Sequence, residues 1–318
     1  MNHRKLTAIV AGVGANAILG FNFIFSNLII DEVSPIVLLA YQCTICVLAM
    51  AVCIPLPIVK CNLRGRGKKL LPLLFMGVCD PLLYDIGTNY ALKCNTSTTF
   101  TAVMVALMPV FALAFGAIFL REIPTALQIV FSVLSVAGVV ILSLQGKNDG
   151  SVSLEGVLFL LLTVASGVGY GLISRGSAKE FGAFERTFGC FFSGMVLVDL
   201  LAVIENIGDL SALVRPLANP RFVLCVLALG ILSSAVEYVA YNYSMTYLPV
   251  SQAMLFSGIS TVTTAVFSVI IFPTERANFT WLTALCIVLI VAGVIGAQMF
   301  GRKEEEAKPK IPPDRQNS

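Results

Sequence analysis

Ten apolar segments, each long enough to cross a lipid bilayer, make up most of this chain. A bilayer core of about 30 Å requires about 20 consecutive apolar residues in a helix. The 318 residues divide into ten such segments joined by short loops: Leu6–Ile30, Ser34–Ile54, Leu70–Leu92, Thr96–Leu120, Pro124–Leu144, Leu154–Ser174, Phe184–Ile204, Phe222–Tyr243, Pro249–Phe272 and Phe279–Met299. The sequence therefore predicts an all-α membrane protein with ten transmembrane helices.

The composition argues against most soluble classes of protein. Apolar residues make up 57% of the chain and charged residues 12%, against about 25% charged residues in a soluble domain. The expected surroundings are the lipid bilayer, and no nucleic-acid partner is expected. The chain has one histidine, and we expect Cys43 and Cys46, spaced C-x-x-C, to pack as small apolar residues. Neither a metal nor a cofactor is predicted.

The distribution of basic residues predicts the orientation in the membrane. With ten helices both termini lie on one side, and that side holds 16 of the 21 lysines and arginines, Arg175 and Arg186 among them. Basic loops remain in the cytoplasm, so both termini are predicted to be cytoplasmic. The expected location is the plasma membrane or a bacterial inner membrane. Residues 301–318 are charged and contain prolines, which predicts a disordered cytoplasmic tail.

The two halves of the chain resemble each other. Asn89-Tyr90-Ala91-Leu92 matches Asn242-Tyr243-Ser244-Met245 at a shift of 153 residues, and the same shift places Glu122 on Glu275. We therefore predict one five-helix repeat in residues 1–152 and a second in residues 153–300. Because five is odd, the second repeat enters the membrane from the opposite side. Inverted repeats of this kind are typical of secondary transporters, whose binding site lies near the midplane between the repeats.

Several short segments resemble a known transporter family. These are residues 91–97 (ALKCNTS), residues 107–111 (LMPVF), Glu122 and residues 137–142 (AGVVIL) in the first half, echoed in the second half by residues 247–251 (YLPVS), Glu275 and residues 289–294 (LIVAGV). The chain from Leu6 to Met299 resembles the EamA-domain transporters of the drug/metabolite transporter superfamily. One difference is Val262, which stands where that family has a proline in the ninth helix. The resemblance implies a carrier, because members mostly export amino acids, other metabolites or drugs.

Four acidic residues fall inside the predicted helices: Asp80, Asp85, Asp199 and Glu237. An ionised carboxylate at the centre of a membrane helix costs about 2.5–3.5 kcal/mol on insertion scales, so these groups should face a cavity or the bundle interior. No basic residue is predicted at the same depth. Such a carboxyl could exchange a proton or bind a cation. Asp199 lies near the outer end of its helix, where we expect it to be solvated.

Glu237 is the leading candidate for binding substrate or a proton. It lies well inside the eighth helix, next to Tyr238 and one turn before Tyr241 and Asn242, so Tyr241 can share its face. The alternative is a neutral glutamic acid that joins two helices through a hydrogen bond.

The third helix is the second candidate region, because Asp80 precedes Pro81. Proline removes a helical hydrogen bond and disfavours helix at the residue before it, and broken helices often line transport sites. Tyr84 follows Asp80 by one turn, and Asn89 follows Asp85. These residues either bind substrate or cap the break. We expect Asp80, Tyr84, Glu237 and Tyr241 to line one central cavity.

The first helix has Asn16, Gly20, Phe23 and Asn27 along one stripe of its surface. This stripe either contacts substrate, with Asn16 as the candidate residue, or packs against other helices.

Hydroxyl residues that open the fourth helix or lie in the ninth are expected to bond their own backbone. Glu122 and Glu275 are expected to anchor helix ends and loops.

The predicted function is a secondary transporter that exports small organic solutes such as amino acids, amines or related metabolites by alternating access, coupled to protons. The alternatives are an uncoupled facilitator, an exporter of lipophilic cations and a membrane-embedded enzyme. An enzyme is disfavoured because the sequence has neither the H-E-x-x-H nor the G-x-S-x-G pattern, so no catalytic residue is proposed. A phosphate-binding G-x-x-x-x-G-K-[ST] loop is also absent. The protein is expected to be a monomer or a homodimer.

Overall fold

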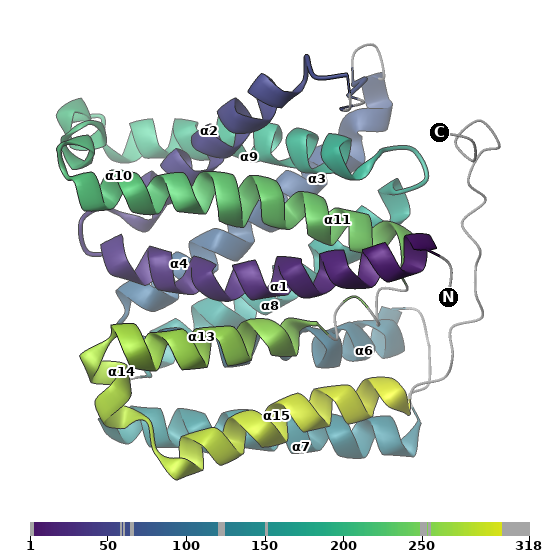
Figure 1. The fold of residues 1–318 in the computed structure, drawn as a ribbon. Helices are drawn as coiled ribbons and strands as arrows, with labels where there is room; N and C mark the ends of the chain where they lie inside the picture. The colour runs from purple at the N-terminus through teal and green to yellow at the C-terminus, as the bar shows by residue number, and fades with distance from the viewer. Residues whose placement is uncertain are drawn as a thin grey trace.

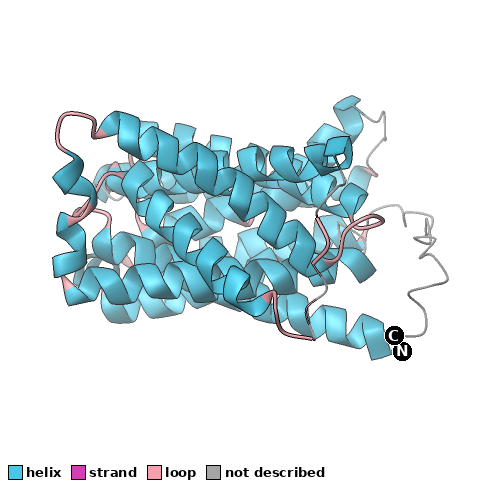
Figure 2. Cartoon of the chain, turned by 90° about the horizontal axis from the view of Figure 1, so that it is seen from above, coloured by secondary structure: helices cyan, strands magenta, loops and turns pink. Residues whose placement is uncertain are grey.

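The fold is a bundle of long helices that run roughly along one common direction, with their loops gathered at the two ends (Figures 1 and 2). It was obtained as a computed structural model. The structure describes residues 3–57, 59, 61–63, 67–119, 125–149, 152–248, 253 and 256–300. These residues form helices, turns and loops, and none of them lies in a β-strand. The all-α prediction is therefore confirmed for the described part of the chain.

The helices lie where the apolar segments predict them. In chain order they are α1 (His3–Ile29), α2 (Pro35–Cys53), η1 (Gly67–Leu70), α3 (Leu71–Gly77), η2 (Val78–Leu83), α4 (Tyr84–Lys93), α5 (Thr98–Val105), α6 (Met108–Phe119), α7 (Ala126–Asp149), α8 (Leu154–Ser177), α9 (Ala183–Glu205), η3 (Leu210–Leu213), η4 (Arg215–Ala218), α10 (Pro220–Leu227), η5 (Ala228–Val236), α11 (Glu237–Tyr247), α13 (Ser257–Ile271), α14 (Pro273–Asn278) and α15 (Trp281–Met299). Seven helical stretches among the described residues are long and apolar enough to cross a membrane, and three further apolar helices are shorter. The predicted boundaries at Leu120, Pro124 and Pro249, together with Glu122 and the tail 301–318, lie outside the described residues.

Two of the long stretches are interrupted at their centres by a π-helix. The stretch Gly67–Lys93 contains η2, and the stretch Pro220–Tyr247 contains η5. At the first break Asp80 has the extended angles φ −156° and ψ 117°, because the following Pro81 disfavours helical angles there. The break predicted at Asp80 is confirmed. π-Helices displace backbone carbonyls from the regular ladder and are frequent at functional sites.

The helices pack in pairs from distant parts of the chain. Helix α1 lies against α11 and α13, α4 against α8, α2 against α9, α5 against α13, and α7 against α15 (Figure 1). The close approach of α4 to α8 depends on Gly87, because a Cβ atom at this position would lie 2.7 Å from the carbonyl oxygen of Phe159.

The outside of the bundle is apolar. On α7 the side chains of Leu127, Val130 and Val133 are 50%, 60% and 61% exposed, and Trp281 and Val288 on α15 are exposed as well. Large exposed apolar surfaces on a helical protein mark contact with a membrane. Together with the apolar spans, this surface identifies a multi-pass membrane protein.

Short polar side chains fix the starts of several helices. The side chains of Ser34, Ser97 and Ser153 accept hydrogen bonds from backbone N–H groups in the first turns of α2, α5 and α8, which is the usual arrangement at a helix N-terminus. The start of α5 has a second cap, because Glu275 of α14 accepts hydrogen bonds from the N–H groups of Thr98 (2.7 Å) and Thr99 (3.2 Å) and from both hydroxyls. The predicted anchoring role of Glu275 is confirmed. The sequence predicted that these two threonine hydroxyls would bond the backbone of their own helix. They bind the carboxylate of Glu275 instead.

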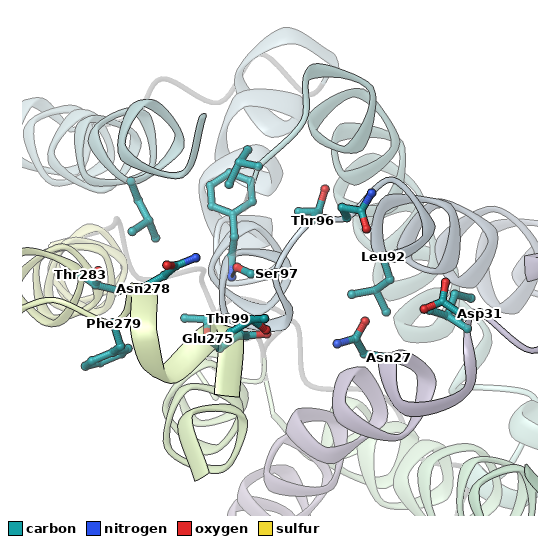
Figure 3. Close-up of a pocket in the computed structure, with 16 residues that line it drawn as sticks. Asn27, Asp31, Leu92, Thr96, Ser97, Thr99, Glu275, Asn278, Phe279 and Thr283 are labelled. Carbon is teal, nitrogen blue, oxygen red and sulfur yellow. Dashed lines mark hydrogen bonds between the residues drawn. The ribbon is translucent and has the colours of Figure 1, made fainter. Parts of the chain in front are cut away.

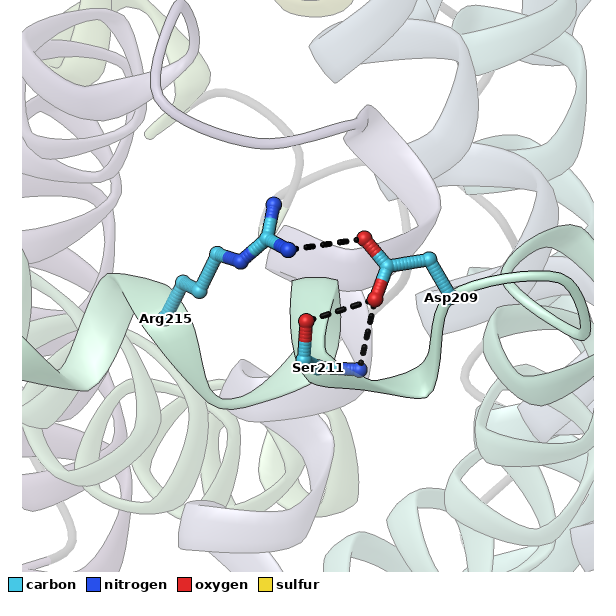
Figure 4. Close-up of polar contacts among 3 residues, drawn as sticks. All are labelled: Asp209, Ser211 and Arg215. Atoms are coloured by element: carbon cyan, nitrogen blue, oxygen red, sulfur yellow. Dashed lines mark hydrogen bonds and ion pairs between the residues drawn. The ribbon is translucent and has the colours of Figure 1, made fainter.

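The long loop between α9 and α10 is held by a small polar contact (Figure 4). Asp209 accepts hydrogen bonds from the backbone N–H and the hydroxyl of Ser211, and it lies 3.0 Å from the guanidinium of Arg215. The hydroxyl of Ser211, and then the charge of Arg215, stabilise the ionised carboxylate and lower the pKa of Asp209. This residue is exposed, so the contact shapes the loop and contributes little to stability.

Candidate functional site

The centre of the bundle contains a small cavity of about 40 Å³. Helices from both halves of the chain contribute to its wall: Asn16, Leu19, Asp80, Tyr84, Val105, Met108, Gly167, Tyr170, Glu237, Tyr238, Tyr241 and Ser257. Six of these residues were predicted from the sequence as site residues: Asn16, Asp80, Tyr84, Glu237, Tyr238 and Tyr241. The prediction that Asp80, Tyr84, Glu237 and Tyr241 line one central cavity is confirmed as geometry.

Asp80 reaches the cavity from the broken third stretch, and its position is fixed from two sides. The hydroxyl of Tyr238 donates a hydrogen bond to its carboxylate oxygen Oδ1, and the thiol of Cys190 contacts its backbone oxygen at 3.2 Å. The Asp80 side chain is buried. The contact joins the stretch Gly67–Lys93, through Asp80, to the stretch Pro220–Tyr247, through Tyr238.

Glu237 is the first residue of α11, directly after the π-helix η5. Its side chain is 4% exposed, and its Oε2 atom has no hydrogen-bond partner among the described residues. The hydroxyl of Tyr84, on the same cavity, is also buried without a partner there. A buried carboxyl without a donor or a cation is costly, so this group is suited to take up a proton or a cationic ligand.

Aromatic rings surround the two cavity acids. The ring of Tyr170 is 5.7 Å from that of Tyr238, at an angle of 85°, and 6.3 Å from that of Tyr241. No lysine, arginine or histidine is among the residues that line the cavity in the described part of the chain. Acidic groups next to aromatic faces favour a cationic ligand, and nothing in this wall offers a positive partner to an anion.

Two predicted site residues lie outside the cavity wall. Asp85 is buried, and Gln42 of α2 lies between it and Ser234 of η5, with its amide nitrogen 3.4 Å from the carboxylate and 3.0 Å from the hydroxyl. Adjacent positions on a helix point about 100° apart, so Asp85 points away from the face that carries Tyr84. Asn89 is buried, and its amide nitrogen has no partner among the described residues. Their functional role stays a prediction.

Three polar residues of this region were not predicted from the sequence as site residues. Tyr170 and Ser257 line the cavity, and Gln42 binds Asp85. Tyr170 and Gln42 each lie in a helix whose other residues are mostly apolar, and a single polar residue of this kind gives no pattern in one sequence. Ser257 is one of several hydroxyl residues of the ninth helix, which were expected to bond their own backbone. Asn16 uses its amide nitrogen to bond the backbone of its own helix, at 2.9 Å from the Gly12 oxygen, while its side chain also lines the cavity.

The surroundings of two charged residues were not expected from the sequence. Arg186, counted among the basic residues of the cytoplasmic side, has a fully buried side chain, and its guanidinium donates to Ser174, Asn242 and Thr246 at the ends of α8 and α11. Asp199 was expected to be solvated. It is half-buried instead and accepts a hydrogen bond from Thr44 of α2 at 3.2 Å.

The contact between Tyr238 and Asp80 leads to a stability prediction. Tyr238→Phe should destabilise the protein by about 1–3 kcal/mol, because it leaves a buried carboxylate oxygen without its donor. Tyr241→Phe is the matched control, since no described residue hydrogen-bonds the Tyr241 hydroxyl. Thermal unfolding of both variants in detergent measures the difference. Equal melting temperatures would show that the Tyr238 hydroxyl contributes nothing to the fold.

Comparison with known proteins places this architecture in a family. The pattern of the EamA-like transporter family matches residues 6–144 and again residues 154–298. An uncharacterized transporter, YcxC of Bacillus subtilis (strain 168), is 28% identical over 315 residues, covering 98% of this chain and 99% of YcxC. A protein of known crystal structure shares the fold with a TM-score of 0.64 at 17% identity, over 94% of this chain and 99% of that one. The chain therefore belongs to the EamA-like transporter family, and it is a multi-pass membrane transporter.

Proposed function

We propose that this protein is a secondary transporter of the plasma or inner membrane that exports small organic solutes, with amines and amino acids as the substrate class, in exchange for protons. The observation that carries the proposal is Glu237, a buried acid without an ion pair, in a central cavity walled by helices of both halves. A group that binds either a proton or a cation, but not both at once, couples their movements.

The arrangement of the two halves supports alternating access. The shift of 153 residues that relates the halves places Glu237 on Tyr84 and Tyr238 on Asp85, so each half carries a π-helix followed by an acid and a tyrosine in opposite order. The family pattern also matches once in each half. These features support ten membrane helices arranged as two inverted five-helix repeats, with the site between them.

The size of the cavity supports a moving carrier. Its volume of about 40 Å³ is far below the ~300–1,000 Å³ of ordinary ligand pockets. The helices around it must therefore move apart to admit a solute. The stretches Gly67–Lys93 and Pro220–Tyr247 are the natural places for this motion, because their helical ladders are already interrupted next to Asp80 and Glu237.

Within the substrate class, the wall favours the ammonium group as the recognised part. Glu237 and Asp80 supply negative charge, and Tyr84, Tyr238 and Tyr241 supply ring faces and hydroxyls. A lipophilic cation would satisfy the same groups. A carboxylate on the solute would find no basic side chain among the described residues of this wall.

Solute flux into proteoliposomes tests the proposal. Purified protein is reconstituted with a pH gradient of one unit, and uptake of a panel of amino acids, amines and lipophilic cations is measured against protein-free liposomes. Coupled transport predicts accumulation above equilibrium that vanishes when the gradient is removed. Equilibration without accumulation would identify a facilitator, and the absence of flux for every solute would contradict the carrier function.

The proposed orientation leads to a labelling prediction. In a cysteine-free background, Gly208→Cys lies in the exposed loop after α9, and Lys179→Cys lies in the exposed turn after α8. An impermeant maleimide applied to intact cells should label position 208, and it should label position 179 only after permeabilisation. The reverse result would contradict the cytoplasmic location of the termini.

A further inference from the structure

A second and larger cavity lies at one end of the bundle, away from the central site. Its volume is about 330 Å³, within the range of ligand pockets. Figure 3 shows Asn27, near the end of α1, and Asp31, just after this helix, across from Glu275 and Asn278 of α14, with Thr99 beside Glu275. Helix α1 begins, at His3, at the opposite end of the bundle (Figure 1), so the proposed orientation makes this the outer cavity.

Among the described residues, the outer cavity offers no basic side chain to an anion. The donors at the start of α5 are occupied by Glu275, which caps Thr98 and Thr99. No lysine, arginine or histidine lines the cavity in the described part of the chain. The neighbouring Lys93 lies 3.7 Å from Asp31 and donates to the backbone oxygen of Ile30 at 3.0 Å.

Several polar groups of the outer cavity remain available to a ligand. The side chains of Asn27 and Asn278 line it and make no hydrogen bond to a described residue. Thr96 also lines it, but its hydroxyl is buried against Gly156, where an added Cβ atom would lie 1.9 Å from this oxygen, so it is not among the groups open to a ligand. The carboxylate of Asp31 is at the mouth, and its contact with Lys93 is a solvent-exposed pair, which contributes little and is readily exchanged.

The outer cavity and the central cavity lie along the same face of α1. Asn16 lines the central cavity, and Asn27 lines the outer one. Eleven residues of helix separate them by about 16 Å. Between them Phe23 is fully buried, packed in a cluster with Tyr84 and Val105 of the central wall. The stripe predicted on this helix thus extends from one cavity, at Asn16, to the other, at Asn27, with Phe23 between them.

We infer that the outer cavity is a second binding site, for small solutes that carry an ammonium group, with Asp31 and the amides of Asn27 and Asn278 as the recognising groups. The identity of the solute rests on the proposed function, because an exported amine would occupy this cavity on its way out. Binding at the outer cavity itself does not depend on Glu237.

Binding can be measured with choline as the probe and 3,3-dimethylbutan-1-ol as its uncharged isostere. Titration calorimetry is carried out on detergent-purified Glu237→Gln protein, whose central cavity is altered. Choline should bind, the isostere should bind at least about fivefold more weakly because it lacks the charge, and addition of Asp31→Asn should remove this preference. Equal binding of both probes, or an unchanged preference without Asp31, would overturn the site.

Cysteine modification gives an independent readout. In a cysteine-free background, Asn278→Cys and, as a second position, Asn27→Cys are treated with a trimethylammonium and a sulfonate methanethiosulfonate reagent. The cationic reagent should react about fivefold or more faster at both positions relative to Gly208→Cys, an exposed control away from the cavity. Choline should slow this reaction. Identical relative rates for the two reagents would contradict an ammonium site, whereas flux that depends on Glu237 would still support the proposed function.

Discussion

Glu237→Gln should leave a folded protein that exchanges solute for solute across a membrane but no longer accumulates solute against its gradient. Glutamine has nearly the same size as a protonated glutamic acid and cannot release a proton. With one proton exchanged per solute, a pH gradient of one unit supports about tenfold accumulation, because each pH unit corresponds to 1.36 kcal/mol. The variant should fall to a ratio of about one. Proteoliposome flux with and without the gradient measures this loss.

Two further variants show whether Glu237 acts alone. Asp80→Asn changes the other acid of the cavity, and Asp85→Asn changes an acid that lies outside its wall next to Gln42. If Glu237 alone holds the proton, both variants should retain most of the accumulation. If the three carboxyls share the proton, each variant should lose as much as Glu237→Gln. Accumulation by Glu237→Gln at the parent rate would contradict a coupling role for this acid and favour a facilitator.

The fold was readily predicted from the sequence because the bilayer imposes simple rules. A membrane helix must bond its own backbone and present apolar side chains to lipid, so apolar runs such as Leu6–Ile30 and Leu154–Ser174 correspond closely to α1 and α8. The break at Asp80 was predictable because proline acts locally on the residue before it. The acids were conspicuous because a carboxylate is rare inside such segments.

The sequence predicted which residues share the central cavity but not which side chains bond each other. Asp85 and Glu237 are alike as acids in apolar helices, yet one bonds Gln42 and the other faces the cavity. The difference depends on how α4 and α11 are rotated, which is set by packing against α8 and α1. The break at η5, in the stretch Pro220–Tyr247, was also missed. This segment contains no proline, and the break is visible only in the backbone.

Arg186 is the residue whose importance was least evident from the sequence, and its replacement should have the largest effect on stability. Its guanidinium donates to the backbone oxygen and hydroxyl of Ser174 at 2.7 and 2.8 Å, and to the Asn242 oxygen and the Thr246 hydroxyl. It thereby joins α9 to the C-terminal turns of α8 and α11, where a positive charge is favourable. Hydrogen bonds to a charged group contribute about 1.5–3 kcal/mol each. Replacing Arg186 also removes the cost of burying its charge, and this gain offsets part of the loss.

Arg186→Met should therefore destabilise the protein by about 3 kcal/mol, because it leaves acceptors at two helix ends without their donor. Arg186→Lys should lose about half as much, since an ammonium group lacks the planar fork that reaches both helices. Arg221→Met is the matched control, because Arg221 is exposed on α10 and its loss should cost less than about 0.5 kcal/mol. Thermal and denaturant unfolding in detergent measure the three changes. If Arg186→Met were as stable as the parent, the guanidinium would not hold these helix ends together, and its burial would need a role in transport instead.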